Sequence, residues 1–367
     1  HERDNLVNLT TLLREVGEHT FDAFNRRSTD EFYTQSLFAR SAYQYLNDTI
    51  HDPQLRKVLS ATSLKMQLDA NTLPLYIFAQ INSSFIQSAY RLRGGGRMIA
   101  DALTAKIRTM GGEVRLNSPV TELIERNGQI SEVVINTGER FSCDCVISNV
   151  HPNATLSLIK ESASIRKIYR SRINRLQNSV GAFTVNIKLK PKTMLYRNHN
   201  LFIHTEQVDQ WRYQQSHTPQ QIMVSWSVPR INSVWAETID IITPMLFSEV
   251  AEWSDSCLGH RPEAYKEFKA RKAEQLIQFA VQYLPELPVA IERIYVSTPL
   301  TYMHYTATQE GSAYGIMKDY NNPMTTILTP RTPIPNLFLT GQNLNLHGIL
   351  GVSMTTELTL RQIIKQL

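Results

Sequence analysis

Apolar and polar residues follow helical spacing through most of the first ninety positions. In the stretch "LVNLTTLLREVGEHTFDAFN" (6–25), large apolar side chains recur three to five positions apart, so they share one face of a helix. The side chains on that face are Leu6, Leu9, Leu13, Val16 and Phe21. This pattern predicts an amphipathic helix near the start of the chain.

Two later parts of this region also predict helices. Asp52-Pro53 is typical of a helix start, because aspartate accepts hydrogen bonds from free amides and proline suits the first turn. The segment "NTLPLYIFAQINSSFIQSAY" (71–90) is apolar on more than one face. A helix buried in the core is the favoured interpretation. The alternative is a wall that lines an apolar cavity or rests on a lipid surface, with residues 75–81 at its centre.

From residue 91 onward the pattern changes. A helical stripe of apolar side chains follows the three glycines at 94–96. The stripe consists of Met98, Ile99, Ala102, Leu103, Ile107 and Met110. The glycine pair at 111–112 predicts the end of this helix, because glycine adopts left-handed backbone angles without a steric clash. We expect a short strand to follow at 113–116.

Alternating segments then predict a three-stranded meander. The segments "PVTELIERNG", "QISEVVINTG" and "ERFSCDCVISNV" cover residues 119–150. Asn-Gly at 127–128 and Thr-Gly at 137–138 separate them, and both pairs are typical of hairpin turns. The apolar run at 145–150 predicts a strand that is buried on both faces.

The middle of the chain has a different pattern of apolar and polar residues. Strands are predicted at 180–191, 200–206 and 221–229, a long amphipathic helix at 261–287, and a further strand within 290–297. From Asn336 onward the sequence returns to the style of the meander region. We therefore predict an α/β fold, α+β overall, with two interleaved domains. One consists of 91–150 and 306–367, and the other of 1–90 and 151–305.

Composition narrows the range of functions. The chain of 367 residues carries a formal charge of +5, and no lysine and arginine cluster is interleaved with aromatic residues, so we expect no nucleic-acid partner. Three cysteines are too few for a disulfide framework and favour a reducing compartment. Histidines do not occur in H-x-x-x-H pairs, so we expect no metal site. Without a bilayer-spanning apolar run or a signal peptide, we expect a cytoplasmic protein with, at most, peripheral membrane contact.

The stretch "LFLTGQNLNLHGILGVSMT" (337–355) combines a buried strand, a polar loop and a helix that starts at glycine. Amides at a helix N-terminus lack acceptors within the helix and carry partial positive charge, so they favour an electron-rich ligand. Glycine lets the backbone approach such a ligand, and Gln342 and Asn343 offer groups that bond hydroxyls. In an open α/β sheet, ligands lie beyond the carboxyl ends of the strands. Taken alone, this stretch favours a structural role for its glycines.

The order of these segments resembles the FAD-dependent oxidoreductases of the amine oxidase and phytoene desaturase type. The matching order is a helix, Gly-Gly, a short strand, "PVTELI", the meander, a large intervening segment and then "LFLTGQN" with its helix. "LTGQN", "RGGGRMIADAL" and "GSAYGI" are most similar to the branch that contains carotenoid desaturases, carotenoid isomerases and retinol saturase. The resemblance covers most of 91–150 and 300–360.

The resemblance implies an FAD/NAD(P)-binding Rossmann-like domain that is interleaved with a substrate domain. The second segment of the FAD-binding domain would be 91–150 and its C-terminal segment 306–367, while 151–305 would bind substrate and 1–90 would form a helical part of the substrate or lid domain. Such proteins begin with a strand, a G-x-G-x-x-G turn and a helix, and nothing in 1–90 matches this. We therefore expect that this chain lacks the N-terminal dinucleotide-binding segment. It should then bind FAD weakly or not at all and be inactive as it stands, with NAD(P) as a further candidate electron partner.

The resemblance also implies roles for individual residues. The backbone of Val120 would contact the adenine end of FAD, and Gly341 and Gln342 would approach its ribityl-pyrophosphate part. Many relatives carry an acidic residue in place of Gln342. Residues 348–351 would lie beside the flavin ring, where their amides stabilise negative charge. The cofactor-binding set is therefore Val120, Gly341, Gln342, Asn343, Gly348, Ile349, Leu350 and Gly351.

Fewer residues are candidates for contact with substrate. Gly95 and Gly96 would let substrate and flavin come close, whereas Arg97 is as well explained by a solvent-facing position. No catalytic base is assigned. Tyr314 and His347 are candidates for a catalytic role, although a structural, hydrogen-bonded role is favoured for His347 and for His151.

The function that the resemblance implies is hydride transfer between flavin and a carbon–carbon bond of a hydrophobic polyene or isoprenoid-like substrate, as in a desaturase, a saturase or an isomerase. The partner would be a hydrophobic small molecule or lipid. Two alternatives stay open: a non-catalytic lipid-binding or scaffold protein that has lost its cofactor, and an amine oxidase.

Overall fold

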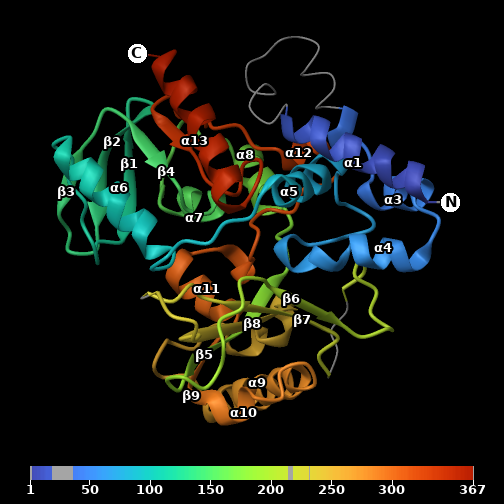
Figure 1. Cartoon of the computed structure of the whole chain (residues 1–367). Coiled ribbons are helices and arrows are strands. Elements are labelled where there is room, and N and C mark those ends of the chain that lie inside the picture. Colours follow the sequence, from blue (N-terminus) through green and yellow to red (C-terminus); the bar gives the residue numbers. More distant parts are fainter. Residues whose placement is uncertain (1, 19–35, 214–217, 231, 367) are drawn as a thin grey trace.

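The part of the chain that the structure describes contains helices and three β-sheets, which is the α/β class with α+β character that the sequence predicts (Figure 1). The computed structural model describes residues 2–18, 36–213, 218–230 and 232–366. Buried apolar side chains form three separate clusters. One lies under the N-terminal helices, one beside the large sheet and one around the short strands near the C-terminus.

The N-terminal part is helical, as predicted. Its elements are α1 (Arg3–Glu18), α3 (Ala42–Thr49), α4 (Pro53–Leu59), the 3-10 helix η2 (Ala61–Lys65) and α5 (Leu75–Gln87). Three of the five stripe residues of α1, namely Leu9, Leu13 and Val16, are buried, while Phe21 falls outside the described residues. The predicted helix start is confirmed, because the Asp52 carboxylate accepts hydrogen bonds from the two amides that begin α4, at 2.7 and 3.2 Å.

Helix α5 lies in the core of this helical part. Residues 75–79 are all buried, and Phe78 packs against the Trp211 ring at a centroid distance of 5.7 Å. The core-helix interpretation is therefore confirmed for this segment, and these side chains do not form a lipid-facing wall. No helix within the described ranges is long and apolar enough to cross a membrane.

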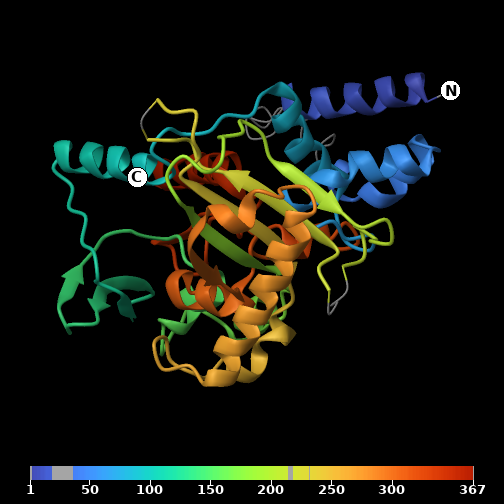
Figure 2. The same cartoon turned by 60° about the horizontal axis from the view of Figure 1, so that its bottom comes forward.

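The helix predicted after the glycines is α6 (Arg97–Thr109). It ends as predicted, with Gly111 in the left-handed region at a φ of 84°. The apolar stripe is not covered, because none of the residues of α6 is buried and Met110 beyond its end is 75% exposed. Figure 2 shows this helix, in teal, projecting from the rest of the molecule. The predicted strand at 113–116 is wrong, because this fully described segment has no regular structure.

The predicted meander is confirmed. It consists of β1 (Val120–Arg126), β2 (Gln129–Ile135) and β3 (Arg140–Ser142) in the order β1-β2-β3, paired antiparallel. Asn127 and Gly128 both have positive φ, at 52° and 78°, which is the conformation that a two-residue hairpin turn requires.

The strand that follows the meander differs from the prediction. β4 (Val146–Ser148) pairs in parallel with β10 (Leu337–Leu339), far away in sequence. Ile147 is 48% exposed, so β4 is not buried on both faces. The reason is that, within the described part of the chain, β10 is the one strand that pairs with it and one side of the pair stays open.

The large sheet has five antiparallel strands in the order β6-β7-β8-β5-β9. They are β5 (Gly181–Leu189), β6 (Leu201–His204), β7 (Gln221–Trp226), β8 (Thr238–Met245) and β9 (Ile291–Ser297). Four of the five strands were predicted, and β8 was missed. The predicted long helix is α9 (Glu263–Val281), which packs on one face of this sheet (Figure 2).

The remaining elements connect these parts. They are α7 (Pro152–Ser157), α8 (Lys167–Asn174), η3 (Phe247–Glu249), η4 (Ala251–Trp253), α10 (Leu287–Ala290), α11 (Pro299–Thr306), η5 (Gln309–Gly311), α12 (Pro323–Thr326) and α13 (Gly348–Ile364). The parallel pairing of β4 with β10 brings together two segments of the chain, one before and one after the strands of the large sheet in the sequence. The residue limits of the two domains stay a prediction.

Candidate functional site

The turn between β10 and α13 is built on glycines that the surrounding backbone requires. Gly341 follows β10 with a φ of 93°, and a Cβ there would lie 2.0 Å from Oδ1 of Asn149, in the loop after β4. At Gly351 a Cβ would lie 2.5 Å from the carbonyl carbon of Leu346. Both glycines therefore let segments pack closely, which agrees with the structural role that was favoured for them.

Gly348 is different, because the space in front of it is open. Its φ is 77°, and no atom lies within 4 Å of where a Cβ would be. The next side chain, Ile349, is 71% exposed. His347 provides no side-chain cap, and within the described residues no oxygen accepts a hydrogen bond from the amides at 348–350. The N-terminus of α13 thus presents free donors and the positive end of its dipole to the outside.

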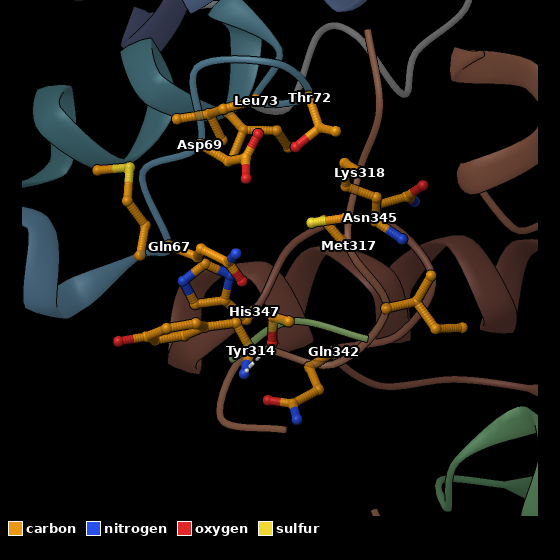
Figure 3. Close-up of a pocket in the computed structure, with 14 residues that line it drawn as sticks. Gln67, Asp69, Thr72, Leu73, Tyr314, Met317, Lys318, Gln342, Asn345 and His347 are labelled. Atoms are coloured by element: carbon orange, nitrogen blue, oxygen red, sulfur yellow. Dashed lines mark hydrogen bonds between the residues drawn. The ribbon is translucent and has the colours of Figure 1, made fainter. Parts of the chain in front are cut away.

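A pocket lies beside this turn, between the segment after η2 and the C-terminal segment (Figure 3). It encloses about 450 Å³, including the space at its mouth. Its lining residues are Met66, Gln67, Asp69, Thr72, Leu73, Ile77, Ser179, Tyr314, Ile316, Met317, Lys318, Gln342, Asn345 and His347. The pocket brings together three residues that the sequence analysis singled out, Gln342, Tyr314 and His347, from segments that lie up to 33 positions apart.

The rings of Tyr314 and His347 lie side by side in this pocket, with centroids 4.8 Å apart. The Tyr314 hydroxyl donates to the carbonyl of Leu64 at 2.9 Å, and Nε2 of His347 lies 3.0 Å from the carbonyl of Lys65. A carbonyl oxygen only accepts, so Nε2 carries the proton and Nδ1 is the acceptor. Both residues therefore tie η2 to the C-terminal segment, and a catalytic role for either one stays a prediction.

Burial controls the protonation of both groups. It lowers the pKa of His347, an effect that the hydrogen bond to the Lys65 carbonyl opposes and the positive charge of Lys318 assists. It raises the pKa of Tyr314 far above its ordinary value, with a smaller contribution from Tyr302. At neutral pH the pocket therefore contains a neutral imidazole and a neutral phenol.

Lys318 is the residue of this pocket that the sequence analysis missed. It is 8% exposed, and its ammonium donates to the carbonyls of Thr326, Asn343 and Leu344 at 2.9, 2.8 and 2.9 Å. Burial lowers its pKa to about 7. Among the described residues no carboxylate lies within ion-pair distance of it. The available signal was one charged residue in "GIMKDY", which gives no indication that backbone carbonyls surround it.

The other predicted residues do not all gather at this pocket. Asn343 is buried, and its Oδ1 accepts from the amide of Ile316 at 3.2 Å, so this side chain points into the protein. Val120 lies at the start of β1 and is partly exposed. Gly95 and Gly96 both face open space, since a Cβ at either position would have no atom within 4 Å, and Arg97 is exposed and pairs with Asp101 at 3.2 Å. A role for Arg97 near substrate or flavin stays a prediction.

His151 has the structural role that the sequence favoured. It is buried, its Nε2 lies 2.9 Å from Oδ1 of Asn178, and its Nδ1 accepts from the amide of Asn153 at 3.2 Å. It caps the start of α7 in this way. Burial lowers its pKa, so the ring is neutral at neutral pH.

Comparison with known families gives one match that spans most of the chain. A family model described as flavin containing amine oxidoreductase matches residues 5–351. The chain is 24% identical over 386 aligned residues to all-trans-retinol 13,14-reductase of Rattus norvegicus, covering 98% of this chain and 61% of that protein. It is 27% identical over 147 residues to a neurosporene-forming phytoene desaturase of Rhodobacter capsulatus, covering 39% of this chain and 28% of that protein. The chain thus spans about three fifths of the length of the retinol reductase.

Solved structures share the fold at low sequence identity. A triple mutant of putrescine oxidase superimposes with a TM-score of 0.61 at 13% identity, covering 100% of this chain and 76% of that one. An oxidoreductase from Methanosarcina mazei superimposes with a TM-score of 0.56 at 16% identity, covering 88% of this chain and 68% of that one.

Proposed function

The chain belongs to the flavin-containing amine oxidoreductases, and from this membership we propose that it is an FAD-dependent oxidoreductase that acts on carbon–carbon bonds of a hydrophobic polyene or isoprenoid-like substrate. The relatives named above support the substrate class, since one is named a retinol 13,14-reductase and the other a phytoene desaturase. An apolar substrate of this kind dissolves in membranes, so peripheral contact with a lipid surface is part of the proposal.

The open N-terminus of α13 is the observation that carries the assignment of the cofactor site. The free amides at 348–350, the empty space at Gly348 and the exposed side chain of Ile349 fit the electron-rich edge of a flavin ring. A bound flavin supplies the hydride-transfer chemistry. The amides of the chain would stabilise negative charge on the ring without moving, because the helix holds them in place.

Other residues would hold the rest of FAD. We propose that Gly341 and Gln342 lie near its ribityl-pyrophosphate part and that the backbone of Val120 lies near its adenine end. The half-buried Gln342 side chain lines the pocket and has an amide that bonds hydroxyls. In the same proposal, the segments 91–150 and 306–367 form the FAD-binding domain, and 151–305 with 1–90 form the substrate domain.

The pocket would contribute positioning and not proton transfer. His347 is neutral and held by its Nε2–H, which leaves Nδ1 as an acceptor for a donor group on the substrate. The hydroxyl of Tyr314 donates its hydrogen bond to the carbonyl of Leu64 and so does not donate one to the substrate. Oxidation or reduction of a carbon–carbon bond by a flavin does not need a permanent side-chain base here, so these residues would orient the substrate and exclude water.

Titration with FAD tests the proposal on the chain and on the natural full-length polypeptide. Binding is read from flavin absorbance that is retained after gel filtration and from quenching of flavin fluorescence. The informative variant is Ile349→Glu, because a carboxylate at this exposed position stabilises the helix start by about 0.3–1 kcal/mol and repels an electron-rich ring. The matched control is Ile349→Gln, which has the same size without the charge.

We expect Ile349→Glu to bind FAD about tenfold more weakly than Ile349→Gln while it unfolds at an equal or higher temperature. Equal FAD affinity of the two variants would refute the placement of the flavin at α13. A full-length polypeptide that retains no flavin colour in excess FAD would refute the oxidoreductase proposal and favour a non-catalytic lipid-binding protein.

A further inference from the structure

Two cationic side chains lie near each other at the edge of the large sheet that β6 forms. Lys65 ends η2, and Arg91 follows α5. The ammonium of Lys65 lies 3.3 Å from the centroid of the Phe85 ring and 5.4 Å from that of Phe202 on β6. Arg91 is held by hydrogen bonds from its guanidinium to the carbonyl of Trp226 on β7 and to Oδ1 of Asn200.

These two cations have no anionic partner. In the part of the chain that the structure describes, no carboxylate lies within ion-pair distance of Lys65 or Arg91, and no oxygen accepts a hydrogen bond from the Lys65 ammonium. Burial lowers the pKa of Lys65 to about 8, and the positive charge of Arg91 contributes to this shift. Neither charge is offset by a carboxylate, so an anion bound beside both groups would stabilise them.

Two other half-buried cations of this chain are compensated. Lys272 forms an ion pair with Glu249. Arg197, which stacks over the Trp226 ring at 5.6 Å, pairs with Glu286 at 3.3 Å. Lys65 and Arg91 differ from these two cations.

One row of side chains next to this pair is apolar, whereas the next row on the same face contains Ser225 and Asp240. Phe202, Met223 and Ile242 are cross-strand neighbours on β6, β7 and β8, in register one after the other. They point away from α9, because the residues that alternate with them, such as Val224 and Ile241, form the core beneath that helix. All three are half-buried. A row of apolar side chains that ends at two cations matches a ligand with an apolar body and an anionic head.

We propose that Lys65 and Arg91 bind the carboxylate of an apolar, chain-like ligand whose body lies along Phe202, Met223 and Ile242. Arg91 keeps N–H groups that are not used by Trp226 and Asn200, and Lys65 has three free donors, so both can bond the same carboxylate. This inference rests on the proposed function for the role of the ligand as a substrate. Its binding does not depend on a flavin.

A fluorescent polyene fatty acid, cis-parinaric acid, is a suitable probe because its emission rises in an apolar site. The experiment compares the acid with its methyl ester, which has the same body and no charge. We expect the chain to bind the acid about tenfold more tightly than the ester. Lys65→Met should remove this preference, Lys65→Arg should keep it, and Lys106→Met, at an exposed lysine of α6, should leave it unchanged.

Equal affinity of the unmodified chain for acid and ester would overturn the proposal, and this result needs no variant that must fold. A preference that persists in Lys65→Met would overturn it as well. Competition with sodium acetate and with inorganic phosphate identifies the source of the anion. If neither salt displaces the acid at millimolar concentration, the site is one for an apolar carboxylate. Displacement by either salt overturns the proposal. A full-length polypeptide that retains no flavin in excess FAD, together with a chain that prefers the acid, would refute the proposed function alone.

Discussion

Replacement of Lys318 by Met tests the energetics of the pocket most sharply. Met has a similar length and fills the same space without the amine. Lys318 donates to three carbonyls, of which Leu344 also accepts from the amide of Leu328 at 3.1 Å. Within the described residues, no other group donates a hydrogen bond to the carbonyls of Thr326 and Asn343, so the variant leaves two buried acceptors unpaired. This costs about 1–3 kcal/mol for each of them.

The buried amine itself opposes this loss. Its pKa is about 7 in the folded chain against 10.5 for an unperturbed lysine. At pH 7 the unfolded chain holds the proton, and the folded chain gives up about half of it. The buried amine therefore lowers the free energy of unfolding at pH 7 by about 4–5 kcal/mol. The two effects nearly cancel at pH 7, so the free energy of unfolding should differ little between the variant and the unmodified chain.

The effects separate as the pH rises. Between pH 7 and pH 9 the unfolded chain still holds the proton that the folded chain has lost, so stability rises with pH. Integrating this difference gives about 2 kcal/mol in favour of the unmodified chain, and Lys318→Met should lack this gain. Urea unfolding followed by tryptophan fluorescence measures it, since Trp211 and Trp226 are buried in two different cores.

Lys106→Met, which removes the same charge from the surface of α6, is the control and should follow the unmodified chain. Parallel stability profiles for Lys318→Met and the unmodified chain from pH 7 to pH 9 would refute the reasoning. They would mean that the three carbonyls hold the amine protonated, and in that case the variant would be less stable at every pH.

Three further predictions concern single residues of the site. Gly341→Ala should lower the free energy of unfolding by about 2–4 kcal/mol, because its positive φ and the nearby Asn149 both resist a Cβ. Gly348→Ala should lower it by about 1 kcal/mol, because only the positive φ opposes the substitution. Thermal unfolding compares the two variants, and equal losses of stability would contradict the packing argument. Tyr314→Phe should lower the free energy of unfolding, measured with urea, by about 1 kcal/mol, because it removes one hydrogen bond, and it should leave FAD affinity unchanged. A loss of FAD affinity at unchanged stability would indicate a role at the cofactor. Because the pKa of His347 is lowered by folding, the unmodified chain should lose stability as the pH falls below about 6.5, and His347→Gln should lose less. An identical acid profile of the two proteins would show that folding leaves the pKa of the ring unchanged.

Local patterns in the sequence were sufficient for the elements that depend on nearby residues. The Asn127-Gly128 turn, the Asp52 cap and a helix that starts at glycine after the C-terminal strand were all predicted, because turn and cap chemistry acts over a few positions. The helix was expected from Gly351 and begins at Gly348. The apolar periodicity of α5 likewise predicted a core helix. The strand β8 was missed, although its residues alternate between buried and half-buried positions.

Tertiary structure decided what surrounds each element, and this changed the interpretation of the site. The strand β4 was expected to be buried on both faces, yet one face is exposed, and the apolar stripe of α6 is exposed as well, because burial depends on a partner and not on the pattern itself. The pairing of β4 with β10 and the carbonyls around Lys318 join positions that are distant in the chain. A residue's own sequence neighbourhood records its intrinsic preferences, whereas its charge state and its ligands are set by atoms that only the folded chain brings within reach.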